Sequence, residues 1–314
     1  MEKRLIIAIA LSFLVLLAFQ FMGGKKKTQF APAPISPVTK NAGTQASAAL
    51  PQETAQRPEQ SLKTEKGTET TIAAGEYEMV FSDIGGSVKK ISVGEDLLFR
   101  EEDPAKKLFA MENNLIPDLS GQKFTKNEGP DFLEYEFTEQ GWITITKRFT
   151  FHKAFNYINL QVSAKNLSSR KIAFSYRMTG PSALEKAGQV IGRSFLEADI
   201  KVNDKIWKAK SVKQPQEKTG AISWAALKNR YFTLMLKPEA SPGSVTVAQA
   251  PSKELAIYVN SQQYELVPGE TVRNNYVFYA GPLDETKLQA GGYGMDEIID
   301  YGSVSYTHLT LPTN

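Results

Sequence analysis

The stretch Ile158-Asn159-Leu160-Gln161-Val162-Ser163-Ala164 alternates apolar and polar side chains at every position. The same period of two recurs in residues 142–146, 172–178 and 255–259. Because successive side chains of a strand point to opposite faces, this alternation predicts an antiparallel sheet with one buried and one solvated face. No long segment with a helical period of 3.6 lies between these stretches, so parallel strand–helix–strand units are not expected.

Turn-forming residues separate the alternating stretches at short intervals across residues 71–283. Gly85-Gly86, Asn203-Asp204 and Pro268-Gly269 are examples, and several short strands with such spacing favour a sandwich or a barrel. The roughly 210 residues involved exceed an immunoglobulin sandwich of about 100 residues. We therefore predict a mainly β domain over residues 71–283, a large antiparallel sandwich of two sheets.

Composition excludes several classes of active site. The 314 residues contain no cysteine and only two histidines, His152 and His308. The absence of cysteine therefore excludes a disulfide framework, a cysteine-ligated metal site, a thiol nucleophile and a lipid-modified cysteine. Two histidines leave little for a histidine-based metal site or a Ser-His-Asp triad. Residues 1–70 carry nine Lys and Arg against five Asp and Glu, whereas the remaining 244 carry 28 against 29. The predicted folded part is nearly neutral, which argues against a nucleic-acid partner.

The first 22 residues contain an apolar run long enough to cross a membrane. Leu5 to Met22 is broken only by Ser12 and Gln20, and as a helix it would extend roughly 27 Å, close to the ~30 Å hydrocarbon thickness. A cleaved signal peptide is the alternative, but its apolar stretch is shorter, at about 7–15 residues, and ends in small side chains. We predict an uncleaved anchor over residues 1–22. Basic residues flank both ends, so charge alone leaves its orientation open.

Residues 23–70 differ sharply in composition from the segments on either side. Five prolines lie among Ala, Thr, Gln, Ser, Lys and Glu, and Phe30 is the sole aromatic residue. Such a segment buries too little apolar surface to offset its chain entropy, so we predict a disordered linker. As a random coil it would span on the order of 40 Å.

Five segments carry landmarks in a fixed order along the chain. They are residues 3–22, Tyr77 to Val93 with Gly85-Gly86, Ser223 to Pro238 with Trp224, Tyr231 and Phe232, Tyr279 to Leu288 with Gly281-Pro282, and Gly292 to Gly302 with Asp300, Tyr301 and Gly302. Taken together, they resemble the YidC family of bacterial membrane protein insertases over residues 1–302.

The resemblance implies a protein of the bacterial inner membrane with a cytoplasmic N-terminus, one span, a linker and a periplasmic β-supersandwich similar to galactose mutarotase. It also implies a function in the insertion, folding and assembly of integral membrane proteins, alone or with the Sec translocon. The implied partners are inner-membrane lipid, nascent membrane proteins, and the Sec components SecYEG and SecDF. No enzyme activity, cofactor, metal or nucleic acid is implied.

The landmark residues also have structural interpretations. Gly85-Gly86 is expected to form a tight turn with positive φ, and Gly281-Pro282 to end a strand. Trp224, Tyr231 and Phe232 are expected to pack at the interface of the sheets. None of these residues is predicted to be catalytic.

The chain departs from the family at its C-terminal end. No segment after Met22 is apolar enough to span a membrane, whereas the family continues into five membrane helices around a hydrophilic groove with a buried arginine. Residues 303–314 resemble a translated sequencing adaptor, and a natural flexible terminus is the alternative. We therefore expect the anchor and periplasmic part of a longer insertase, with an exit helix over 284–302 and a non-native tail over 303–314.

Two other interpretations stay open. A carbohydrate-binding sandwich would use Trp142, Trp207 or Trp224 as a stacking platform, and mutarotase-type catalysis would need an acid–base pair for which only His152 is available. A membrane-tethered periplasmic chaperone, complete as it stands, would need no further membrane helices.

Overall fold

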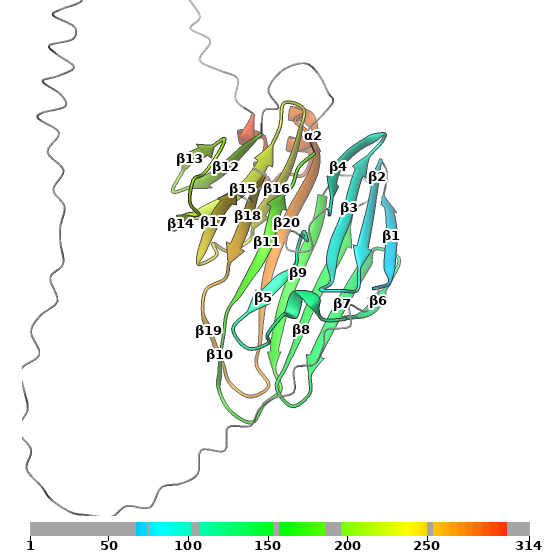
Figure 1. Cartoon of the computed structure of the whole chain (residues 1–314), viewed down its shortest axis with the longest axis vertical. Helices are drawn as coiled ribbons and strands as arrows, with labels where there is room; N and C mark the ends of the chain where they lie inside the picture. Colours follow the sequence, from blue (N-terminus) through cyan, green and yellow to red (C-terminus); the bar gives the residue numbers. More distant parts are fainter. Residues whose placement is uncertain are drawn as a thin grey trace, which may run out of the picture. The chain divides into compact units, whose positions relative to one another are not determined.

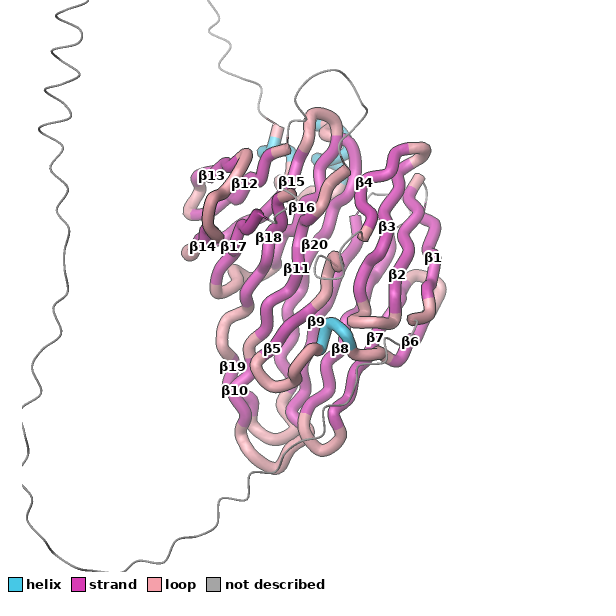
Figure 2. The backbone as a smooth tube through the Cα atoms, viewed as in Figure 1, coloured by secondary structure: helices cyan, strands magenta, loops and turns pink. Residues whose placement is uncertain are grey.

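The computed structural model describes residues 67–74, 76–101, 107–152, 157–185, 196–249 and 254–299. All of them belong to one compact unit of the chain. The described strands form four sheets in which every paired strand is antiparallel (Figure 1), and the helices are short (Figure 2). The predicted mainly β, antiparallel fold is confirmed.

The largest sheet has nine strands. In spatial order they are β13 (Lys205–Ala209), β12 (Glu197–Val202), β15 (Ile222–Lys228), β16 (Phe232–Pro238), β20 (Thr271–Pro282), β9 (Tyr157–Asn166), β8 (Ile143–Phe151), β7 (Phe132–Glu139) and β6 (Thr125–Glu128). Its two edges are therefore β13 and β6.

The other sheets are smaller. Five strands form the order β14 (Gln216–Lys218), β17 (Ser244–Gln249), β18 (Leu255–Asn260), β11 (Tyr176–Ser182) and β5 (Met111–Asn113). Four form a meander of β1 (Glu69–Ala74), β2 (Tyr77–Ser82), β3 (Ser87–Val93) and β4 (Asp96–Arg100). The pair β10 (Ile172–Phe174) and β19 (Tyr264–Leu266) makes a short ribbon. The described helices are η2 (Leu119–Gly121), α2 (Glu285–Ala290) and η3 (Asp296–Ile298).

The main core lies between the nine-stranded sheet on one side and the five-stranded sheet and four-stranded meander on the other. Strand β11 contacts β15 and β16, and β18 contacts β12 and β15, so the five-stranded sheet covers one half of the large sheet. Phe81 of β2 packs against Phe149 of β8 with ring centroids 5.0 Å apart, so the meander covers the other half. Aromatic and aliphatic side chains from all three sheets are almost fully buried between the layers. The described residues therefore form a large two-layer sandwich.

The stretch that predicted the fold forms β9 at the centre of the large sheet. Ile158, Leu160, Val162 and Ala164 all lie in the main core, at most 5% exposed. The polar residues between them alternate to the other face, and β9 pairs with β8 on one side and β20 on the other. The period of two therefore gave both the strand and the face it buries.

The Gly85-Gly86 turn joins β2 to β3 as predicted. Both glycines have positive φ, at 73° and 52°. A Cβ on Gly86 would lie 2.9 Å from Cβ of Tyr135, and one on Gly85 would lie 2.5 Å from the carbonyl oxygen of Ser120. Backbone conformation and close packing both require glycine here.

The C-terminal end of the described chain differs from the predicted exit helix over 284–302. The α-helix extends only over Glu285–Ala290, and η3 adds one turn of 3₁₀-helix at Asp296–Ile298. Gly292 and Gly294 lie between them with φ of 68° and 66°, a conformation that ends a right-handed helix. The prediction of one continuous helix is wrong for this reason.

Several predicted features lie outside the described residues. They are the anchor ends Leu5 and Met22, most of the linker, the landmarks Asp300, Tyr301 and Gly302, and the tail 303–314. β1 begins at Glu69, two residues inside the segment predicted as linker. Within the described ranges, no helix has the length and hydropathy needed to cross a membrane.

Candidate functional site

A second apolar cluster lies on the face of the nine-stranded sheet that is turned away from the main core. The sheet contributes Tyr157, Trp224, Ala226, Met235 and Tyr279, and the residues after β20 contribute Leu288, Met295 and Ile298. Sequence neighbours such as Ile158 and Ala225 belong to the main core, so the cluster side chains point to the opposite face. We call the sheet residues of this cluster the docking face, and residues 283–299 the C-terminal segment.

The C-terminal segment is held onto the docking face by buried side chains. Leu288 and Met295 are both 0% exposed. Tyr157 packs its ring against Tyr279 and Tyr293, with centroids 5.1 and 5.3 Å away. Its hydroxyl donates to the carbonyl oxygen of Leu288 at 2.6 Å, and burial raises the pKa of that hydroxyl to about 12. The phenol therefore stays protonated and serves as a hydrogen-bond donor.

The local sequence explains the shape of this segment. Asp284 caps α2 by accepting a hydrogen bond from the backbone N–H of Lys287 at 2.9 Å, which satisfies one of the free donors at the start of the helix. The backbone N–H of Leu283 donates to the carbonyl oxygen of Tyr231 at 2.7 Å. The turn between β15 and β16 thus fixes where the segment leaves β20.

Three lysines from neighbouring strands of the nine-stranded sheet hold the far part of the segment. Lys201, Lys228 and Lys237 lie on β12, β15 and β16, which are adjacent in the sheet. Their partners are, in that order, the carboxylate of Glu297, the carbonyl oxygen of Ile298 at 3.3 Å and the carbonyl oxygen of Tyr293 at 2.7 Å. Two of the three contacts satisfy backbone carbonyls, so they depend on the path of the chain rather than on its side chains.

A buried ionic cluster lies under the end of this segment. Nζ of Lys228 is 2.6 Å from Oδ2 of Asp199 and 3.6 Å from Oε1 of Glu197, and Asp199 is 0% exposed. Burial raises the pKa of Asp199 to about 6, although Lys228 acts in the opposite direction. Because buried charges need partners, Lys228 links β12 to the C-terminal segment.

A second buried lysine supports the Gly-Gly turn. Lys147 of β8 is 0% exposed, and its Nζ donates to the carbonyl oxygens of Gly85 and Phe109, at 2.6 Å each. Burial lowers the pKa of Lys147 to about 7. It fixes the turn from inside the core.

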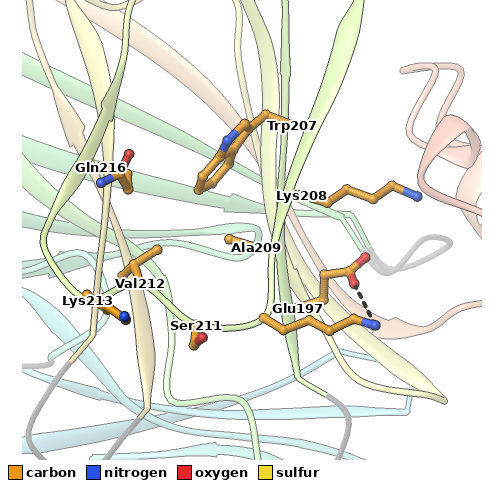
Figure 3. Close-up of a pocket in the computed structure, with 9 residues that line it drawn as sticks. Glu197, Trp207, Lys208, Ala209, Ser211, Val212, Lys213 and Gln216 are labelled. Atoms are coloured by element: carbon orange, nitrogen blue, oxygen red, sulfur yellow. Dashed lines mark ion pairs between the residues drawn. The ribbon is translucent and has the colours of Figure 1, made fainter. Parts of the chain in front are cut away.

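A shallow hollow of about 570 Å³ opens beside edge strand β13 (Figure 3). Its lining residues are Glu197, Trp207, Lys208, Ala209, Lys210, Ser211, Val212, Lys213 and Gln216. Glu197 and Lys210 form an ion pair at 3.8 Å, drawn as the dashed line. Three lysines and one carboxylate give this surface an excess of positive charge.

The tryptophans do not form the stacking platform that a carbohydrate module would use. Trp224 is 1% exposed within the docking face. Trp142 and Trp207 pack against the main core, and the cations of Arg170 and Lys218 lie 4.8 and 4.2 Å from their ring centroids. Since each ring is already in contact, the structure does not favour sugar stacking.

The described residues contain no group of three or more His, Cys, Asp or Glu side chains that could hold a metal ion. His152 lies at the exposed end of β8, where Nε2 is 2.9 Å from the amide nitrogen of Asn159. Among the described residues the ring forms no ion pair with a carboxylate, and it serves as a hydrogen-bonding group at the surface.

The other landmark residues have different environments. Phe232 packs against the main core, as predicted. Tyr231 is 51% exposed and Trp224 lies in the second cluster on the outer face, so the prediction that these two residues pack between the sheets is wrong. Its turn is held by Asn229, whose Oδ1 accepts from the backbone N–H groups of Tyr231 and Phe232 at 2.8 Å each. Gly281-Pro282 ends β20, as predicted.

Comparison with known families gives the identity of this architecture. The family model described as the YidC periplasmic domain matches residues 117–312, which is more than half of the chain. The chain belongs to the YidC family. The match reaches into residues 303–312, where we predict a non-native tail.

Curated relatives of the family match most of the chain at modest identity. Proteins named membrane protein insertase YidC from Geotalea daltonii and Syntrophus aciditrophicus are 25% and 26% identical, each over 96% of this chain. One from Geotalea uraniireducens is 28% identical over 96% of this chain. The matches cover 61%, 63% and 61% of these relatives, so the chain spans about three fifths of their length.

Solved structures with the same fold are mutarotase-like. A galactose mutarotase related enzyme from Lactobacillus acidophilus has a TM-score of 0.53 and 9% identity, covering 68% of this chain and 97% of its own. A galactose mutarotase-like protein from Lactobacillus casei has a TM-score of 0.53 and 7% identity, covering 68% and 100%. At such low identity the likeness concerns the fold, and it confirms the expected supersandwich.

Proposed function

We propose that this chain is the anchor and periplasmic part of an inner-membrane insertase, which inserts, folds and assembles integral membrane proteins. The observation that carries the proposal is the family match over residues 117–312, supported by relatives named membrane protein insertase along 96% of the chain. The clients are nascent membrane proteins, and the insertase acts alone or with the Sec components SecYEG and SecDF.

The proposed organisation follows the chain. Residues 1–22 anchor the protein with the N-terminus in the cytoplasm, residues 23–70 link the anchor to the sandwich, and residues 71–283 form the periplasmic sandwich. Residues 284–302 lead from the sandwich to the membrane-embedded insertase core. From its resemblance to a translated adaptor we also propose that the tail 303–314 is not native, although the family match extends through residue 312.

The sandwich holds the chain that follows it in a fixed orientation. The C-terminal segment makes hydrogen bonds and ionic contacts with β9, β12, β15 and β16. Contacts spread over four strands resist rotation about any one of them, so the chain leaves the sandwich in a defined direction. The periplasmic domain would thereby be oriented over the insertase core and over any Sec partner.

The mechanism involves no covalent chemistry. A groove that offers polar groups within the bilayer lowers the cost of moving polar segments across it, because unpaired polar groups in hydrocarbon are expensive. Such a groove would belong to the membrane helices, and the sandwich would supply position and a docking surface. A membrane-tethered chaperone is the second candidate, but no observation favours it over the family assignment.

Complementation of a bacterial strain depleted of its own insertase tests the proposal. The gene extended to its natural end should restore growth and the insertion of a small Sec-independent membrane protein. A matched gene with the membrane helices after Gly302 removed should not. Failure of the full gene to restore insertion, with the protein present in the membrane, would contradict the proposal.

A further inference from the structure

Basic side chains gather at one edge of the nine-stranded sheet. β13 is an edge strand, paired only with β12 among the described strands. The hollow beside it is lined by Lys208, Lys210 and Lys213 and by a single carboxylate, Glu197. The side chain of Lys210 is 67% exposed. The hollow therefore presents more positive than negative charge to solvent.

This hollow lies beside the place where the chain leaves the sandwich. Glu197 contacts Lys210 in the hollow at 3.8 Å and Lys228 beneath the C-terminal segment at 3.6 Å. Lys228 in turn donates to the carbonyl oxygen of Ile298, the residue before the last described one. One carboxylate thus separates the basic hollow from the exit of the C-terminal segment.

We propose that this basic hollow docks against the anionic phospholipid headgroups of the membrane. The inference rests on the proposed function, under which the chain after Ile298 leads directly into the bilayer. A surface one side chain away from that exit is then held near the headgroups. Lysine ammonium groups near an anionic membrane surface are attracted to it over about one Debye length, close to 10 Å at ordinary salt.

The chemistry of the hollow favours a lipid surface over a sugar or an acidic protein. The ring of Trp207 is covered by Lys218 and packs against the core, so it offers no stacking platform. The hollow is open and shallow, with exposed lysine side chains around a buried Val212. Exposed lysines on flexible stems suit a fluid layer of phosphates, which needs charge without a fixed geometry.

The absence of cysteine makes a site-specific test straightforward. Ser211→Cys places a single label in the hollow, and Asn127→Cys places one on β6, the opposite edge of the same sheet. Each full-length variant carries an environment-sensitive fluorophore and is reconstituted in nanodiscs of phosphatidylcholine, or of equal parts phosphatidylcholine and phosphatidylglycerol. Headgroup-nitroxide phosphatidylcholine is the quencher. We expect quenching at position 211 that needs phosphatidylglycerol and weakens at high salt, and none at position 127.

Charge variants identify the side chains responsible. Lys210→Gln with Lys213→Gln removes two lysines and should lower the ratio of docked to undocked sandwich about 25-fold, at about fivefold for each lysine. Lys123→Gln with Lys126→Gln is the matched control, because those lysines line a hollow near β6. The control should leave quenching at position 211 unchanged.

Four results would overturn the inference. They are equal quenching in both lipid mixtures, no quenching at position 211, quenching that survives the Lys210 and Lys213 substitutions, and protection of the label by polyglutamate but not by phosphatidylglycerol. The last would assign the lysines to an acidic protein. Co-elution of the chain with the discs is scored separately. A chain that enters the discs without docking contradicts this inference alone, whereas a chain that does not enter them contradicts the proposed anchor as well.

Discussion

Removing one buried side chain from the C-terminal segment should release the segment while leaving the sandwich folded. Leu288 is 0% exposed and is the one buried residue of α2. Leu288→Ala removes a buried side chain and leaves a cavity, which costs about 2–5 kcal/mol. Because the main core is a separate cluster, this cost should fall on local opening of the segment. Its opening constant should rise about 30-fold to about 5,000-fold.

Amide hydrogen exchange measures this directly. The N–H groups of Gly292 and Ile299 donate to carbonyls within the segment and should lose protection by those factors. Amides in the ladder between β8 and β9 should keep theirs. Thr286→Ala, an exposed position of the same helix, is the matched control and should change little. Unchanged protection at Gly292, or an equal loss in β8 and β9, would refute the view that the segment is a separately held unit.

Three further predictions concern buried groups and the turn. The pKa of Asp199 is raised to about 6, so between pH 4 and 6 the native state holds a proton that the unfolded state has lost. The free energy of unfolding of the wild type, measured by urea titration relative to Asp199→Asn, should therefore fall as pH rises from 4 to 6. The pKa of Lys147 is lowered to about 7 from 10.5, so between these values the unfolded state binds a proton that the native state does not. The free energy of unfolding of the wild type, relative to Lys147→Met, should therefore rise between pH 7 and 10. The same pH dependence in both proteins would contradict the burial of an uncharged lysine. Gly86→Ala should lower the free energy of thermal unfolding by about 2–4 kcal/mol, because the new Cβ would both strain a backbone with positive φ and meet Tyr135. Gly94→Ala is the control. Gly94 has a φ of 58° and open space around it, so this change should cost about 1 kcal/mol.

The sandwich could be predicted from the sequence because its central strands bury one face and solvate the other. β9 and β8 keep the alternation of apolar and polar residues along most of their length. The Gly85-Gly86 turn was equally accessible, since two adjacent glycines between strands indicate positive φ. These features depend on local pattern, which a single sequence contains.

The docking face was missed, although the sequence carries a signal for it. Residues 224–227 of β15 are apolar without alternation, and all are buried. A strand with a continuous apolar run is typically covered on both faces. The covering element, a six-residue helix and one 3₁₀ turn, is too short to be recognised from periodicity.

The buried lysines and the exposure of Tyr231 needed three-dimensional information. Lys147 occupies an inward position of β8 between Ile145 and Phe149. The carbonyl oxygens that accept hydrogen bonds from its Nζ belong to residues 38 and 62 positions earlier in the chain. Tyr231 follows a turn whose geometry is set by the Asn229 side chain. Long-range partners and turn conformation are not encoded in hydrophobic spacing.

We propose that this sandwich is the periplasmic part of a membrane protein insertase, which requires a longer gene. Reading the source gene past the codon for Gly302 tests it most directly. We expect five further apolar segments of about 20 residues each, long enough to cross a bilayer, with an arginine inside the first of them. A natural stop codon directly after Asn314 would contradict it, because the chain would then lack the helices that insertion requires.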